Sequence, residues 1–146
     1  MKYMMQEGTL ALPDATEDRT VNIFQMTGVG KGESCNLVVN RDVCEAGETL
    51  EAYVSRQLKL LGRTMRSMKE TARREAVIGT PQVPAMEIEV RSTDVSTGRV
   101  QYQILACCKL SDRSVLLFTL TSPSPLSEAL RSDWQRIIGS FSPYAA

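Results

Sequence analysis

Runs of alternating and contiguous apolar residues divide this chain into short strands and two amphipathic helices. A period of two between turn-forming residues predicts a strand, and a period near 3.6 predicts a helix. Strands are therefore predicted over residues 9–12, 19–26, 34–41, 70–78, 86–91, 99–110 and 114–121. The glycine-rich segment 28–32 joins two of them and is interpreted as a hairpin connection.

Two stretches carry apolar residues at helical spacing. The first helix is predicted to open after Gly47, with Thr49 as its N-cap and Glu51 in its first turn. Its apolar stripe, interrupted by Gly62, is Leu50, Val54, Leu58, Leu61, Met65 and Met68. The second helix is predicted with Ser124 as cap and Pro125 at its first position. Its stripe is Leu126, Leu130, Trp134, Ile137 and Ile138.

The order of these elements is strands, a helix, several strands and a final helix. Regular alternation of strands and helices, typical of a doubly wound parallel sheet, is missing, so we predict an α+β fold with a largely antiparallel sheet and two main helices. A length of 146 residues favours a single domain over 1–146. In the strand 86–91, alternation predicts Met86, Ile88 and Val90 inside and the charged residues outside.

Two predicted strands are apolar on both faces. In the strand 19–26, Val21 and Ile23 share one face, and Phe24 and Met26 share the other. In the strand 34–41, Leu37 and Val39 oppose Val38. We expect the two helices to cover one face of the sheet. The second face then either closes a two-sided core, under a loop or helix, or forms an apolar surface for a partner.

Three glutamines lie beside these apolar positions. Gln57 flanks the apolar stripe of the first helix, while Gln101 and Gln103 share one face of the strand 99–110. An uncharged amide both donates and accepts hydrogen bonds. Each glutamine alone is typical of an exposed surface. Together, next to an apolar groove, they would suit a ligand that is mostly apolar but carries polar groups.

Charge and composition narrow the function classes. Seventeen basic and seventeen acidic side chains leave a formal net charge of zero, so no overall field favours nucleic acid or an anionic membrane. The basic cluster from Arg63 to Arg74 is interpreted as a solvated helix end. The chain contains no histidine, which removes the commonest general base and zinc ligand. We therefore expect no enzyme activity, no catalytic residue, no metal and no cofactor.

The N-terminal sequence predicts a cytoplasmic location, and this location in turn predicts the state of the cysteines. The N-terminus turns polar at Gln6 and lacks the apolar core of a signal peptide, and no run approaches the length of a membrane span. The four cysteines are then expected to be reduced. Cys107 and Cys108 are adjacent in a predicted strand, so they should point to opposite faces and behave as buried apolar residues.

An ordered set of segments along nearly the whole chain resembles the Eag chaperones, the DcrB-like proteins with a PsbP-like fold that accompany type VI secretion effectors. The likeness begins with Glu7-Gly-Thr-Leu-Ala-Leu-Pro-Asp14 and Asp18-Arg-Thr-Val-Asn-Ile-Phe24. It continues through Leu37-Val-Val-Asn-Arg-Asp42, Gly47-Glu-Thr-Leu-Glu-Ala-Tyr-Val-Ser-Arg-Gln-Leu58 and Val100-Gln-Tyr-Gln-Ile-Leu105. It ends with Trp134-Gln-Arg-Ile-Ile-Gly-Ser-Phe-Ser-Pro143.

The resemblance implies a curved, PsbP-like sheet and a cytoplasmic homodimer. It further implies a chaperone that shields the N-terminal transmembrane segments of a secreted effector and helps to load the effector onto the spike protein, without inserting into the membrane itself. The alternative is a periplasmic or cytoplasmic domain of the wider family that binds a small ligand or a protein. The groove implied by the resemblance is lined by Val21, Ile23, Val38, Gln57, Met65, Gln101 and Gln103.

Overall fold

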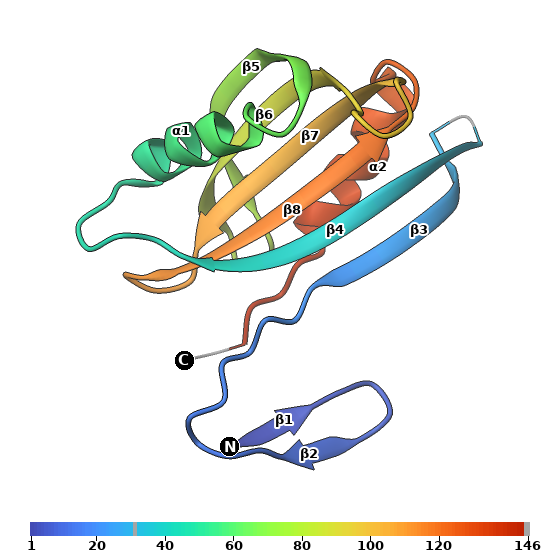
Figure 1. Cartoon of the computed structure of the whole chain (residues 1–146). Coiled ribbons are helices and arrows are strands. Elements are labelled where there is room, and N and C mark those ends of the chain that lie inside the picture. Colours follow the sequence, from blue (N-terminus) through green and yellow to red (C-terminus); the bar gives the residue numbers. More distant parts are fainter. Residues whose placement is uncertain (31, 145–146) are drawn as a thin grey trace.

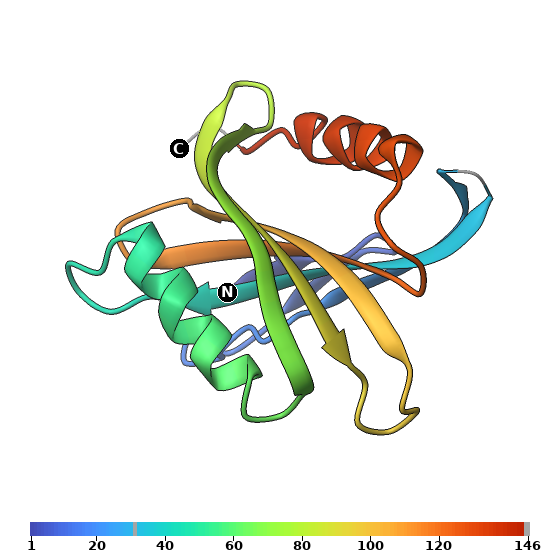
Figure 2. The same ribbon diagram turned by 90° about the horizontal axis from the view of Figure 1, so that it is seen from above.

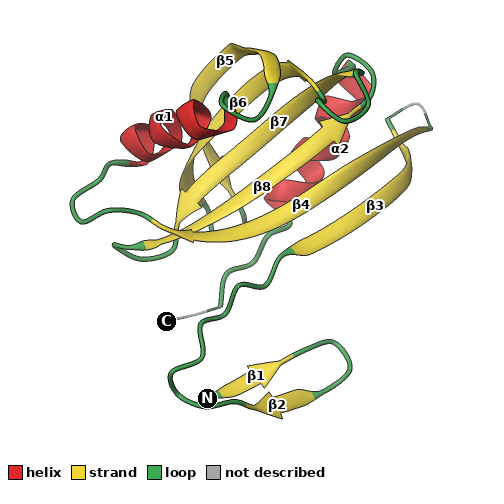
Figure 3. Ribbon diagram, viewed as in Figure 1, coloured by secondary structure: helices red, strands yellow, loops and turns green. Residues whose placement is uncertain are grey.

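A six-stranded, fully antiparallel sheet forms the centre of the protein (Figure 1). The computed structural model describes residues 1–30 and 32–144. The strand order is β3-β4-β8-β7-β6-β5. Its strands are β3 (Asn22–Val29), β4 (Glu33–Val43), β5 (Arg66–Ile78), β6 (Val83–Thr93), β7 (Val100–Lys109) and β8 (Ser114–Ser122). The predicted α+β class and the antiparallel sheet are therefore confirmed (Figure 3).

Two helices and a separate hairpin complete the chain. Helix α1 (Leu50–Leu61) follows β4, and helix α2 (Glu128–Gly139) follows β8. Strands β1 (Lys2–Met4) and β2 (Thr9–Ala11) pair only with each other and lie apart from the main sheet (Figure 1). The sheet is curved, and register shifts between Arg66 and Lys69 and between Glu70 and Ala72 interrupt the pairing of β5 with β6. Such irregularities increase the local bend and twist of a strand.

The helices lie on opposite faces of the sheet, so the expectation that both cover one face is wrong (Figure 2). On one face, Leu130, Trp134 and Ile138 of α2 pack against strand residues that include Leu37 and Leu120. On the other face, a second core forms around Tyr53, Val54 and Leu58 of α1 with Met86, Ile88, Val90, Cys107 and Val115. The apolar stripe of each helix thus packs into a separate hydrophobic core, one on each face of the sheet.

Local signals place the helix ends, with two corrections. Thr49 is the N-cap of α1, and its Oγ1 accepts a hydrogen bond from the backbone N–H of Ala52 at 3.1 Å. The predicted cap of α2 is wrong, because Ser127 and not Ser124 caps the helix. Ser124 precedes Pro125, and a residue before proline is disfavoured in the helical region. The helix therefore starts only after Pro123 and Pro125.

The first helix is also shorter than its stripe indicates. It ends at Leu61, and the N–H of Gly62 donates to the Leu58 carbonyl at 2.9 Å as the C-cap. Met65 consequently lies in the connection to β5, and Met68 lies in β5 itself. The basic cluster after Arg63 belongs mostly to this edge strand, so its interpretation as a helix end is wrong. A glycine in the stripe weakens a helix, and the chain must turn here to reach the sheet edge.

Two glutamates predicted to face solvent are buried beneath α2. Glu87 accepts hydrogen bonds from Trp134 Nε1 at 2.5 Å and from Arg74 Nε at 2.6 Å. Glu89 accepts two from Arg131, at 2.5 and 2.8 Å, and also pairs with Arg74. The middle of strand β6, residues 85–90, lies between the two helical layers, and both of its faces are buried there. A buried carboxylate is tolerated only when it is paired and hydrogen-bonded, as here.

The adjacent cysteines point to opposite faces, as predicted. Cys107 belongs to the core under α1, and Cys108 to the core under α2. Burial raises the pKa of Cys107 to about 12 and that of Cys108 to about 11. Both are thiols at neutral pH, and the thiolate is the reactive form of cysteine. They serve as apolar packing groups.

We expect Leu130→Ala to lower the free energy of unfolding by about 2–5 kcal/mol, because it opens a cavity in the core under α2. The matched control is Leu60→Ala, at a position of α1 that is 45% exposed, with a change of about 1 kcal/mol or less. Urea unfolding followed by circular dichroism measures both. Equal losses in the two variants would contradict the assignment of α2 to the core.

We expect the free energy of unfolding to fall as the pH drops from about 4.5 towards 2. Hydrogen bonds from Arg56 lower the pKa of Glu48 from 4.5 to about 2, so the folded state releases this proton more readily than the unfolded state. The stabilisation is complete above the unfolded pKa and is lost through the folded one. Urea titrations at several pH values should show a shallower acid slope in Glu48→Gln than in the exposed control Glu7→Gln.

Candidate functional site

Helix α1 covers only part of its face of the sheet and leaves a surface over β3, β4 and β8, which we term the open face. In register across the strands, Ile23 of β3 pairs with Val38 of β4, then with Thr119 of β8 and Leu105 of β7. The next row towards α1 contains Leu117 of β8. Val21 precedes β3 and, by continued alternation, lies on the same side as Ile23.

The open face exposes apolar side chains that would be buried if they belonged to the hydrophobic core of this chain. Ile23 is 70% exposed and Val21 is 48% exposed, whereas Leu37 and Val39 on the α2 face are buried. Val38, Leu105 and Leu117 are half-buried. A contiguous apolar patch of this kind is typical of an interaction surface. The core therefore does not account for the apolar residues on this side of β3 and β4.

The predicted glutamines border the open face on the same side of the sheet. Gln103 Nε2 donates to Thr121 Oγ1 at 3.0 Å, and Gln101 Nε2 donates to Ser92 Oγ at 3.3 Å. Met65 lies against both Ser92 and Gln101, since its sulfur accepts from Ser92 Oγ at 3.2 Å. A cavity of about 330 Å³ lies at this polar end, and its lining includes Gln25, Asn36, Gln101 and Thr121.

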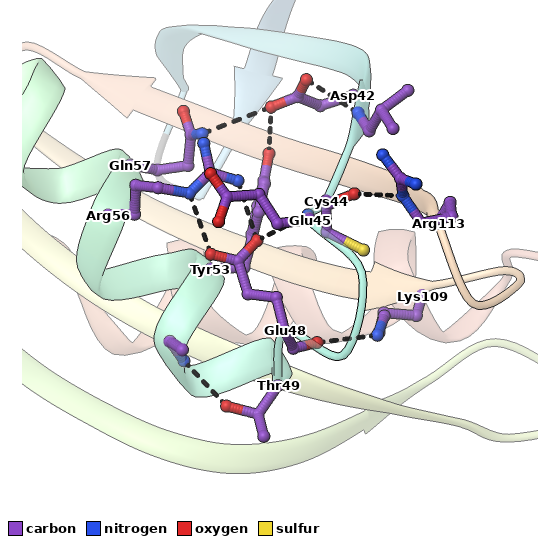
Figure 4. A network of polar contacts seen from close by, with 12 residues as sticks. Asp42, Cys44, Glu45, Glu48, Thr49, Tyr53, Arg56, Gln57, Lys109 and Arg113 are labelled. Atoms are coloured by element: carbon purple, nitrogen blue, oxygen red, sulfur yellow. Dashed lines mark hydrogen bonds and ion pairs between the residues drawn. The ribbon is translucent and has the colours of Figure 1, made fainter.

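Gln57 projects from the flank of α1 that faces β4 (Figure 4). Its Nε2 donates to Asp42 Oδ2 at 3.3 Å, and Tyr53 Oη donates to the same oxygen at 2.6 Å. Burial, together with the bond to Asp42, raises the pKa of Tyr53 above its usual value of 10, so the hydroxyl remains a donor. These bonds tie α1 to the end of β4 and fix one border of the open face.

A second set of bonds holds the start of α1. Arg56 forms a bidentate pair with Glu48, at 2.8 and 2.9 Å, and Glu48 Oε1 also accepts from the Glu45 N–H (Figure 4). Lys109 Nζ donates to the Glu48 carbonyl at 2.9 Å, which joins β7 to the loop before the helix. Arg113 Nε donates to the Cys44 carbonyl at 2.6 Å. The position of α1, and so the width of the open face, depends on this network.

The structure brings the sequence-predicted site residues to one side of the sheet. Val21, Ile23 and Val38 lie on its apolar part, and the remaining four border it: Gln57, Met65, Gln101 and Gln103. Alternation along the strand 99–110 also places Leu105 on the face of Gln101 and Gln103. Sequence reasoning missed three further strand residues that complete the open face, which are Leu117, Thr119 and Thr121. Alternation along each strand predicts which face of the sheet a residue occupies. The register that aligns these residues with Ile23 depends on tertiary structure.

Asp42 and Ser92, which accept hydrogen bonds from the amides of Gln57 and Gln101, were also missed. Neither is adjacent in sequence to its glutamine. Asp42 is the last residue of the quoted segment Leu37–Asp42, but nothing in that segment indicates that it contacts Gln57. Only the packing of α1 beside β4, and of β6 beside β7, brings each pair together.

Comparison with known proteins shows the family. The DcrB family model matches residues 7–140, so the chain belongs to the DcrB family. Residues of the chain are also 33% identical over 57 positions to a Pseudomonas aeruginosa protein named Effector EagT6. That match covers 39% of this chain and 40% of the relative, so it spans about two fifths of the relative's length. The expected relation to the DcrB-like Eag proteins is confirmed.

A solved structure supports the fold. The crystal structure of a Pseudomonas aeruginosa protein of unknown function, PA94, matches with a TM-score of 0.77 and 22% identity. The match covers 100% of this chain and 98% of that one. At this identity the likeness shows the fold alone. Within the described part of the chain, no helix has both the length and the apolar character needed to cross a membrane.

We expect Gln103→Met to leave stability unchanged or to raise the free energy of unfolding by up to about 1 kcal/mol. Gln103 is buried, and its Oε1 has no hydrogen-bond partner among the described residues, so an apolar side chain of similar shape removes an unmet polar group. Chemical denaturation measures the change, with Gln82→Met at an exposed turn position as control. A loss above 1 kcal/mol would count against this account of the amide.

Proposed function

We propose that this protein is a chaperone for a type VI secretion effector and that its open face holds the effector's N-terminal transmembrane helices before secretion. The observation that carries the proposal is the exposure of Ile23 and Val21 on a sheet face that α1 leaves uncovered. The name of the relative Effector EagT6 associates that protein with effectors, which supports an effector-related role here.

The size and chemistry of the open face suit an apolar helix. A transmembrane segment of about twenty apolar residues would aggregate in water, and burying it gains about 25 cal/mol per Å² of apolar surface. The curved face offers strand residues Ile23, Val38 and Leu117 for this contact. Helices of membrane proteins also pack through polar side chains, and Gln57, Gln101 and Gln103 border the face where a neighbouring helix would place them.

The arrangement favours an extended partner over a small ligand. A cavity of about 690 Å³ lies elsewhere, between the start of α1 and strands β5 and β6. The open face itself is not enclosed, and a cavity of about 330 Å³ lies at its polar end. Small-molecule sites usually enclose most of their ligand. A small-ligand carrier of the wider family remains the alternative, and it would use that larger cavity.

The remaining parts of the proposal concern assembly and place. We propose a cytoplasmic homodimer, in which two copies together enclose a client with more than one apolar segment and help to load it onto the spike protein. Strands β3 and β5 end the sheet with unpaired backbone groups, and natural proteins usually cover such edges. Light scattering with and without a client tests the dimer, and cell fractionation tests the location.

We expect Ile23→Asp to abolish client binding while the fold survives, because Ile23 is exposed and a charge on this surface would have to be desolvated by the client. The measurement is the yield of soluble effector fragment, with its N-terminal apolar segments, when it is co-expressed with each variant. Val38→Asp should act in the same direction. Circular dichroism and urea unfolding verify that each variant is folded.

A matched pair of valines provides the control. Val21 is 48% exposed beside β3, and Val77 is 50% exposed in β5 at the opposite edge of the sheet. We expect Val21→Asp to reduce capture of the effector fragment and Val77→Asp to leave it unchanged. If the fragment is equally soluble without this protein, or if both valine variants behave alike, the open face is not the client site.

A further inference from the structure

One end of the sheet is strongly basic. It consists of residues 59–70, at the end of α1 and the start of β5, and residues 91–102, at the end of β6, the following turn and the start of β7. Figure 2 shows these segments together at one end of the sheet. We term them the basic end, and they carry six cations and two carboxylates: Lys59, Arg63, Arg66, Lys69, Arg91 and Arg99 against Glu70 and Asp94.

The two carboxylates leave this charge unneutralised, because each is engaged locally. Glu70 forms a bidentate pair with Arg73, at 2.6 and 2.9 Å. Asp94 Oδ1 accepts hydrogen bonds from Ser96 and Thr97 within its own turn. In the part of the chain that the structure describes, none of the six cations forms an ion pair. Their charge is therefore available to a partner.

Two of these cations lie directly opposite each other. Lys69 of β5 pairs in register with Arg91 of β6, and both residues are exposed. Like charges at opposite positions of neighbouring strands destabilise a sheet. Charged residues on an edge strand oppose aggregation, which accounts for Lys69 but not for Arg91, because β6 is an interior strand. The pair therefore indicates a site for an acidic group.

An aromatic ring positions Arg91. Its guanidinium carbon lies 5.9 Å from the ring centroid of Tyr102, the residue opposite it on β7. A cation above an aromatic ring is attracted by the ring electrons. This contact uses the flat side of the guanidinium, so the N–H donors at its edge are left for a ligand.

A cavity of about 220 Å³ adjoins this pair of residues, between β6, β7 and the segment before α2. Arg91 and Tyr102 form its charged and aromatic side, and Pro125 and Leu126 form its apolar side. The carboxylate of Glu89 also lines the cavity, but two arginines neutralise this group. The cavity therefore combines free positive charge with room for an apolar side chain.

We propose that the basic end binds an acidic segment of a partner protein. A carboxylate of that segment contacts Arg91 and Lys69, and a neighbouring apolar side chain enters the cavity beside Tyr102. The guanidinium of arginine matches a carboxylate through two parallel hydrogen bonds. By alternation from Glu89, Arg91 lies on the α2 face, opposite the open face, so the inference does not rest on the proposed client site.

Two other anionic partners fit less well. The surface of a bilayer is flat, whereas the cavity between the sheet and the segment before α2 admits a protruding side chain. The formal net charge of zero provides no overall field that would attract nucleic acid. An acidic peptide supplies both the carboxylate and the apolar group that this site accommodates.

The experiment uses three short peptides labelled with an uncharged dye. The first carries glutamates interspersed with leucines, the second has glutamine in place of every glutamate, and the third has serine in place of every leucine. Fluorescence anisotropy measures their binding to the full chain. We expect the first peptide to bind about tenfold more tightly than the second and about threefold more tightly than the third. Its affinity should fall as the salt concentration rises.

Variants assign the binding to the basic end. Lys69→Gln and Arg91→Gln should each weaken binding of the first peptide about three- to tenfold. The matched control is Arg136→Gln, in the last turn of α2, whose cation is already paired with Asp133, and it should leave the affinity unchanged. The urea midpoint of Lys69→Gln should stay the same or rise, because one of two opposed like charges is removed.

Several results would overturn the inference. Equal binding of the glutamate and glutamine peptides would show that charge is not recognised, and unchanged affinity in both variants would place the peptide elsewhere. A lower urea midpoint in Lys69→Gln would assign this cation to the fold. Preferential binding of phosphatidylserine vesicles or of a DNA duplex would name a different partner. None of these results bears on client capture at the open face, which Ile23→Asp tests separately.

Discussion

One helix is too narrow to cover one face of a six-stranded sheet, and the rest of this structure depends on that mismatch. Adjacent strands lie about 4.8 Å apart, so six of them span roughly 24 Å, while a helix with its side chains is about 10 Å wide. Helix α1 packs over β6, β7 and the start of β8, where Val115 belongs to its core, and it leaves β3 and parts of β4 and β8 open. Because α2 lies on the opposite face, no second helix closes this gap within residues 1–30 and 32–144.

Polar contacts hold α1 in a position that leaves the open face uncovered. The bonds of Glu48, Arg56, Tyr53 and Asp42 hold α1 at the end of β4, so it cannot slide across to shield Ile23. On the far face, the pairs of Glu87 and Glu89 with Arg74 and Arg131 connect the edge strand β5, its neighbour β6 and helix α2. Removing one partner of such a pair is costly, because the other charge stays buried. Rigid borders of this kind preorganise a surface for binding.

The uncovered part of the sheet also connects the fold with the proposed role. An open apolar face is a liability for an isolated protein, since it favours aggregation. For a chaperone of apolar helices, the role proposed here, such a face is the working surface, because contact between apolar surfaces is non-directional and accepts varied partners. The match to Effector EagT6 covers two fifths of each chain, so the support for this role comes from the geometry and the relative together.

Sequence patterns determined the local features. Alternation and capping act between near neighbours, and they predict the strands of the main sheet, the N-cap at Thr49, the opposite faces of Cys107 and Cys108, and the separation of Val21 and Ile23 from Phe24. The short strand β1 was not predicted. Composition and the quoted segments were also sufficient to point to the DcrB-like Eag proteins.

Only the tertiary structure decided which face each helix covers, where α1 ends, and that Glu87 and Glu89 are buried. It also brought Asp42 to Gln57 and Ser92 to Gln101. These outcomes depend on strand order and register, which are set by contacts between residues far apart in the chain. A single chain's periodicity tells which residues share a face, but not what packs against that face.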